Sequence, residues 1–166
     1  MKMLKLPFYL MMILLMASCG GGGSGEKTSE KKAEEPETPA SIKEGKGIGE
    51  IKHVELTDEL NKDMVEGGGD IYDMKCASCH KLTDQRVVGP GFQGVTNRRK
   101  PEWIMNMITN TDVMLAEDPE AQKMLEECLT RMPNQNVSKE DARKILEFFR
   151  SNDLEKTGQK DGAIES

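Results

Sequence analysis

The chain has 166 residues, enough for one folded domain with tails, and its aromatic content of only 4% indicates a small core. A bound cofactor could help to fill and stabilise a core of that size. The formal net charge of −6, with no basic run longer than the three residues that start at Arg98, argues against nucleic acid as a partner.

The first nineteen residues are typical of an export signal. Two lysines precede an apolar stretch over residues 6–17, which is long enough for a signal peptide and short for a membrane span. The stretch ends in Met-Ala-Ser before Cys19, which resembles a bacterial lipoprotein lipobox, although Met16 stands where Leu is more usual. We therefore predict a signal peptide over residues 1–18 and a periplasmic protein anchored to the membrane by acyl chains on Cys19. An ordinary signal peptide cleaved near this cysteine is the alternative.

Residues 19–48 are predicted to form a flexible linker, because Gly, Glu, Lys, Ser, Thr and Pro dominate this segment and leave little apolar surface to bury. Residues 49–66 form an N-terminal extension. Within it, Thr57 can cap a helix over residues 58–66, which the three following glycines would end. A second helix is expected from about Asp70 into the cysteine motif that follows.

Cys76 begins the sequence Cys-Ala-Ser-Cys-His, which has the C-x-x-C-H spacing of a c-type haem attachment site. Two thiols on one helical turn can each reach a vinyl group of a single porphyrin, and the adjacent imidazole can bind its iron. We predict that Cys76 and Cys79 bond one haem c covalently and that His80 ligates the iron. A zinc site is one alternative, with Cys128 and His53 as distant further ligands. A thioredoxin-like redox pair is another, but no βαβ pattern surrounds the motif.

Three more helices are expected in the second half of the chain. Pro101 suits the first position of a helix over residues 101–108. Asp118 precedes a second helix over residues 120–130, and Ser138 caps the last helix together with Asp141. The apolar stripe of the second helix consists of Met124, Leu125, Cys128 and Leu129, and that of the last helix consists of Ala142, Ile145, Leu146 and Phe149.

Residues 67–152 resemble a mono-haem class I cytochrome c. The resemblance is carried by four short motifs, which are Cys76–His80, Gly89–Pro90, Trp103–Ile104 and Met132–Pro133. It implies an all-α fold of short helices around one covalent haem, in which the first and last core helices cross and bring Tyr72 to Phe149. No strand-like alternation of useful length contradicts this class. The polar tail over residues 153–166 is predicted to be disordered.

The resemblance also implies roles for four residues near the haem. In this family the proline of the Gly-Pro step accepts the proton of the proximal imidazole on its carbonyl, a role that we assign to Pro90. The indole N–H of Trp103, or else Arg98 or Arg99, is expected to bond a haem propionate. The alternatives are a plain Gly/Pro turn, a Trp that only packs in the core, and solvated arginines.

Met132 is the methionine that we predict as the second axial ligand. It lies 52 residues after His80, and a Met-Pro step followed by a polar loop and a closing helix resembles the distal segment of class I cytochromes c. Most other methionines fit the signal or the helices, where Met usually fills the core. Met114 and, as part of a bis-His pair, His53 remain alternatives.

A haem held by an imidazole and a thioether has no open iron site, so the resemblance implies an electron carrier and not an enzyme. A haem enzyme or sensor with open iron is the alternative. The expected partners are a quinol-oxidising complex as donor and a periplasmic reductase or terminal oxidase as acceptor. Residues 102–108 and 132–136 are also similar to lipoprotein cytochromes encoded beside nitrous-oxide reductases, which would make that enzyme the acceptor.

Overall fold

The predicted all-α class is confirmed. The computed structural model describes residues 38–164, and within that range it contains helices and, apart from an isolated bridge between His80 and Arg86, no β-structure. The signal peptide, Cys19 and most of the predicted linker lie outside the described residues. The helices are α1 (Ala40–Lys43), α2 (Lys62–Lys75), α3 (Val95–Arg98), α4 (Pro101–Thr109), α5 (Thr111–Glu117), α6 (Pro119–Cys128) and α7 (Lys139–Thr157).

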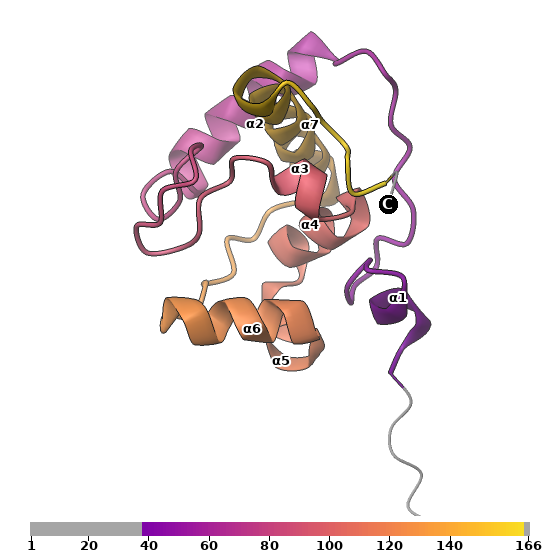
Figure 1. The fold of residues 1–166 in the computed structure, drawn as a ribbon, viewed down its shortest axis with the longest axis vertical. Coiled ribbons are helices and arrows are strands. Elements are labelled where there is room, and N and C mark those ends of the chain that lie inside the picture. Colours follow the sequence, from indigo (N-terminus) through magenta and orange to yellow (C-terminus); the bar gives the residue numbers. More distant parts are fainter. Residues whose placement is uncertain (1–37, 165–166) are drawn as a thin grey trace, which may run out of the picture. The chain divides into compact units, whose positions relative to one another are not determined.

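Helices α2 and α7 cross at one end of this part of the chain, as expected from the family resemblance (Figure 1). The rings of Tyr72 and Phe149 meet edge to face at the crossing, with their centroids 6.4 Å apart. Gly68 lies against the backbone of α7, and a Cβ atom there would overlap the carbonyl of Lys144. This crossing positions the C-terminal end of α2, which leads into the cysteine motif.

The start of α2 differs from the sequence prediction. The three glycines of residues 67–69 do not end a helix; they lie in the middle of one, because close packing on α7 offsets the low helix propensity of glycine. Thr57 also does not cap the helix, since its hydroxyl donates to the carbonyl of Glu59. Asn61 is the cap, and its side chain accepts from the N–H of Met64 at 3.0 Å.

Helix α7 begins as predicted, with the Ser138 side chain accepting from the N–H of Asp141 at 3.0 Å. It continues to Thr157, although disorder was predicted from residue 153 onward. Asp153 is fully buried and accepts from the backbone N–H groups of Gly94 and Thr96 at 2.6 and 2.8 Å. A carboxylate that fixes the loop before α3 in this way keeps the last turns of α7 ordered.

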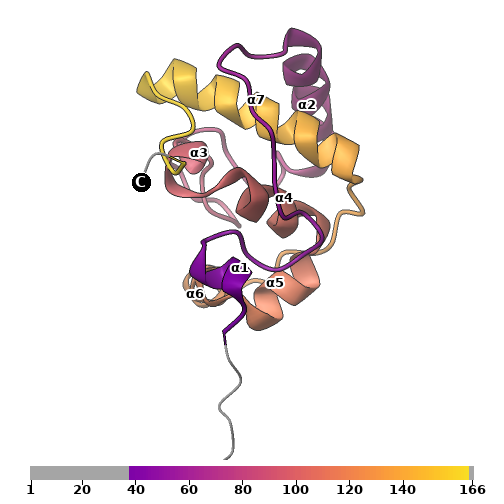
Figure 2. The same ribbon diagram turned by 90° about the vertical axis from the view of Figure 1, so that its right-hand side faces the viewer.

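A segment over residues 46–61, which we call the strap, runs from α1 past α4 to the start of α2 (Figures 1 and 2). The buried Asn106 of α4 accepts from the N–H of Ile51 at 3.1 Å and donates to its carbonyl at 2.9 Å. Asn110 donates to the carbonyl of Ile48 at 3.1 Å. The end of the predicted linker, residues 40–48, is therefore helical or docked, because side chains of α4 and of its C-terminal cap Asn110 bond its backbone.

Helices α5 and α6 lie at the end opposite to the α2–α7 crossing in both views (Figures 1 and 2). Helix α4 has the predicted start and ends one residue beyond the predicted end. Helix α6 begins at Pro119, with Asp118 as its cap, and packs against α5. Leu129 was expected on its apolar stripe but is 89% exposed, because it ends the helix with a positive φ of 56°.

Candidate haem site

The cysteine motif continues the last turn of α2. The N–H of Cys76 donates to the carbonyl of Tyr72 at 2.8 Å, and the N–H of His80 donates to that of Cys76 at 3.0 Å. The buried hydroxyl of Tyr72 donates to the carbonyl of His80 at 2.7 Å. Since Tyr72 also packs in the α2–α7 crossing, the helix pair fixes the backbone that carries both thiols and the imidazole.

The imidazole of His80 is held by the loop that follows. Its Nδ1 lies 2.8 Å from the carbonyl oxygen of Pro90, which is the contact expected from the sequence. A carbonyl oxygen can only accept, so the ring carries its proton on Nδ1 and keeps the lone pair on Nε2 for a metal. Phe92 stacks on the ring with centroids 4.4 Å apart, and a Cβ atom at Gly89 would overlap it.

The surroundings of His80 also favour a neutral ring. Burial lowers the pKa of the imidazole, and the bond to Pro90 opposes this only in part. A neutral imidazole is the form that binds iron. The thiol of Cys76 has a raised pKa, chiefly because of burial, and Cys76, Cys79 and Cys128 are all free of disulfides.

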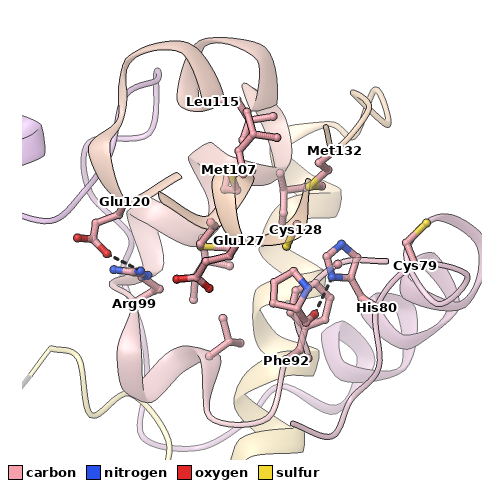
Figure 3. Close-up of a pocket in the computed structure, with 18 of the residues that line it drawn as sticks. Cys79, His80, Phe92, Arg99, Met107, Leu115, Glu120, Glu127, Cys128 and Met132 are labelled. Atoms are coloured by element: carbon pink, nitrogen blue, oxygen red, sulfur yellow. Dashed lines mark hydrogen bonds and ion pairs between the residues drawn. The ribbon is translucent and has the colours of Figure 1, made fainter. Parts of the chain in front are cut away.

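A cavity of about 350 Å³ lies beside His80 (Figure 3). One wall is the loop that carries Gly89, Pro90 and Phe92, and Cys79 also reaches the cavity. The opposite wall comes from α4, α5, α6 and the loop after α6, and charged side chains such as Glu127 and Arg131 form part of it. Its apolar and sulfur-containing side chains include Trp103, Met107, Leu115, Met124, Cys128 and Met132.

The structure separates the three candidates for the second axial ligand. Met132 lines the cavity and points into it from the loop after α6, facing the side that holds His80 (Figure 3). Met114 is fully buried elsewhere, and its sulfur accepts from the N–H of Ile48 at 3.1 Å. His53 has a 73% exposed side chain on the strap, next to Glu102, and does not line this cavity.

Trp103 differs from the role expected for it. Its indole N–H donates to the side chain of Asp118 at 3.1 Å, and the same oxygen accepts from the N–H of Ala121 at 2.9 Å. The indole N–H is therefore used to tie α4 to the capped start of α6. Its ring still lines the cavity, and the guanidinium of Arg99 lies 4.9 Å from the ring centroid.

Arg98 and Arg99 both reach the cavity, as a propionate-binding role would require. Arg98 donates to the carbonyl of Gln93 at 2.5 Å. Arg99 pairs with Glu120 of α6 at 2.7 Å (Figure 3). Each guanidinium has five N–H donors, so these bonds leave others available.

The arrangement does not support the zinc alternative. A zinc site needs about four converging ligands. Among residues 38–164, no group of three or more His, Cys, Asp and Glu side chains is placed to hold a metal ion. The imidazole of His80 lines the cavity together with Cys79 and with the thioethers of Met107, Met124 and Met132, and these donors fit a covalently attached haem.

Comparison with known proteins agrees with this chemistry. The family model for cytochrome c matches residues 65–153. The chain belongs to the cytochrome c family. Its cofactor is therefore a covalently bound haem c, and the function of the family is electron transport. No curated protein sequence matches the chain.

Solved structures give the same family. A cytochrome c from Rhodothermus marinus is 30% identical, with a TM-score of 0.65 over 70% of this chain and 97% of that one. An engineered form of that protein is 30% identical, with a TM-score of 0.63 over 68% and 96% of the two chains. The engineered form bound to a carbene intermediate is 29% identical, with a TM-score of 0.60 over the same shares.

Two features of the site were not predicted from the sequence. Cys128 was expected to be a buried core residue, but it is half-buried and lines the cavity. Cys128 lies four residues after Met124, on the same face of α6. This spacing could have predicted that both side chains face the cavity. The stacking of Phe92 on His80 had no signal in the sequence, because the turn of the loop between them decides it.

Proposed function

We propose that the protein is a one-electron carrier whose haem is bonded to Cys76 and Cys79 and ligated by His80 and Met132. The observation that carries this proposal is that His80 and Met132 line the same cavity, with Nε2 of His80 free and Met132 on the facing wall (Figure 3). Arg98 and Arg99, which also reach the cavity, would donate to the haem propionates.

The haem supplies the redox chemistry, and the residues of this chain decide how it is used. Pro90 holds the proton on Nδ1 of His80, which fixes the ring and raises its basicity as a ligand. A thioether from Met132 would favour the reduced iron and would leave no open position for a substrate. Apolar side chains such as Leu115 and Phe149 line the cavity and would pack against the porphyrin.

The substitution Met132→Ala tests the ligand set. We expect the oxidised variant to lose the iron–thioether charge-transfer band of the wild type and to bind carbon monoxide rapidly once reduced. Met124→Ala is the matched control, because Met124 also lines the cavity but lies on α6, and it should keep the band. The proposal is wrong if the band survives in Met132→Ala, and rapid carbon monoxide binding by the wild type would favour an open-iron enzyme or sensor.

We also propose that the protein is a periplasmic lipoprotein held by acyl chains on Cys19. The basis is the signal-like N-terminus and the small residues before the cysteine. No helix within residues 38–164 combines the length and hydropathy needed to cross a membrane. Cys19→Ser should move the protein from the membrane fraction to the soluble fraction, and persistent membrane association of the variant would contradict the lipid anchor.

The proposed electron donor is a quinol-oxidising membrane complex, and the proposed acceptor is a periplasmic reductase or terminal oxidase. Nitrous-oxide reductase is the narrower proposal, and it is supported only by the similarity of residues 102–108 and 132–136 to cytochromes encoded beside that enzyme. Stopped-flow oxidation of the reduced protein by purified nitrous-oxide reductase measures this directly. Oxidation no faster than with an unrelated copper protein would remove that acceptor.

A further inference from the structure

The wall of the cavity that carries Met132 has few helix contacts with the α2–α7 pair. This distal segment, residues 111–137, consists of α5, α6 and the following loop, and the main helix partner of α6 is α5. The start of α6 is anchored by the buried bond between Trp103 and Asp118 and by the pair of Arg99 and Glu120. The far end of α6 and the loop with Met132 need other contacts to stay over the cavity.

Arg86 supplies one of these contacts. It lies in the loop after His80, and its guanidinium donates to the backbone carbonyl of Glu127 at 2.8 Å and to the carboxylate of Glu127 at 3.1 Å. Glu127 is in the last turn of α6 and lines the cavity. Arg86 lies on the same side of the cavity as His80. It therefore holds the end of α6 through both the backbone and the side chain of Glu127.

Lys75 supplies a second contact on the other side of the cysteine motif. Its ammonium group donates to the backbone carbonyl of Gln135 at 3.1 Å. Lys75 directly precedes Cys76, and Gln135 follows Met132 by three residues. The two basic side chains therefore lie before and after the motif, and each reaches the distal segment within a few residues of Met132.

We propose that Arg86, assisted by Lys75, is a positioning residue that latches the distal segment and thereby keeps Met132 on the haem iron. This inference rests on the proposed ligation by Met132. The start of α6 is anchored by its own contacts, and Arg86 and Lys75 hold the end of α6 and the loop that carries Met132. Removing the latch raises the population in which the segment has swung away and the iron position is free.

Imidazole binding to the oxidised protein measures that population, because an external ligand binds only after the thioether has left. Its apparent affinity rises in proportion to the open fraction. For Arg86→Ala we expect imidazole to bind about three- to tenfold more tightly than in the wild type, since a partly exposed ion pair with one further hydrogen bond is lost. Lys75→Ala should give a smaller increase, and Arg86→Lys should restore part of the wild-type behaviour.

Lys156→Ala is the matched control. It removes the same charge from an exposed side chain, but the partner of Lys156 is Glu155 on the same helix, so no contact between the cavity walls is lost. The measurement is repeated in the Met132→Ala background. If Arg86 acts through Met132, Arg86→Ala no longer changes imidazole affinity there.

The results distinguish a failure of the Arg86 latch from a failure of the proposed ligation by Met132. If the wild type shows the iron–thioether band and Arg86→Ala binds imidazole like Lys156→Ala, the latch is overturned while the ligand set stands. If Arg86→Ala raises the affinity equally with and without Met132, Arg86 only restricts entry to the cavity, and the positioning role is overturned. If the wild type lacks the band, the proposed ligation itself has failed.

Discussion

At the scale of single residues, the most unusual feature is the pair of buried charges on α7. Glu147 is fully buried and Arg150 is 1% exposed. Their side chains bond each other at 3.0 Å, and Arg150 also binds Asp161 at 2.7 Å and the carbonyl of Thr57 at 2.7 Å. Removing one member of this network should lower the stability of the protein strongly, because it leaves a buried charge without its partner.

The pKa of Glu147 makes this network sensitive to acid. Burial alone would raise the pKa, but hydrogen bonds from Arg143, the N–H of Asn61 and Arg150 outweigh it. The pKa of Glu147 therefore lies below its ordinary value of 4.5. A carboxylate whose pKa is lower in the folded state than in the unfolded state stabilises the protein at pH values above the unfolded-state pKa. This stabilisation is lost as the pH falls through the pKa of the folded state.

We expect Glu147→Gln to lower the free energy of unfolding by about 2–4 kcal/mol at neutral pH, because two arginines lose their charged partner. The gap to the wild type should narrow below pH 4.5, where the wild type loses the same contribution. Denaturant titrations at several pH values measure this. Glu155→Gln, at an exposed position of α7, is the control and should match the wild type. A gap that stays constant down to low pH would contradict the role of the carboxylate.

At the scale of elements, the glycines of α2 show how tertiary packing decides a helix boundary. Three consecutive glycines predict the end of a helix, since each one costs about 1 kcal/mol relative to Ala. The crossing with α7 reverses that preference. A Cβ atom at Gly68 would overlap the Lys144 carbonyl, while Gly67 has only ordinary contact with the Lys144 side chain.

The neighbouring glycines give opposite predictions for the same substitution. Gly68→Ala should destabilise the protein by about 1–3 kcal/mol or more, because the two helix backbones would have to separate. Gly67→Ala should stabilise it by about 0.5–1 kcal/mol, because Ala favours the helix and nothing obstructs its methyl group. Thermal or chemical unfolding of the haem-loaded variants measures both. Equal effects at the two positions would show that the close crossing does not determine stability.

The sequence predicted those elements whose signals are local. The Ser138 cap and the apolar stripe of α7 each depend on a few adjacent residues, and the structure has the hydrogen bond and the burial expected of them. The contact between His80 and the Pro90 carbonyl was implied by the family resemblance, and it is also present. The partner of Trp103 could not be predicted, because Asp118 competes for the indole only once α4 and α6 are packed together.

At the scale of the whole described chain, the two ends of the domain are fixed by the same helix. The strap reaches Arg150 through the carbonyl of Thr57, and the C-terminal segment reaches it through Asp161. The sequence predicted a polar extension and a disordered tail for these regions, because polar composition does not reveal a distant buried partner. Helix α7 therefore organises segments that lie far apart along the chain.

The cavity is bordered by the same side chains that build the interior. Val95, Trp103, Ile104, Met107, Leu115 and Phe149 all belong to the buried core and all face the space beside His80. Without haem, the apolar side chains that line this cavity would lack contact atoms on one side. Attachment of the porphyrin would therefore also complete the packing of the core, so we expect chains without haem to be degraded by proteases faster than chains that carry it.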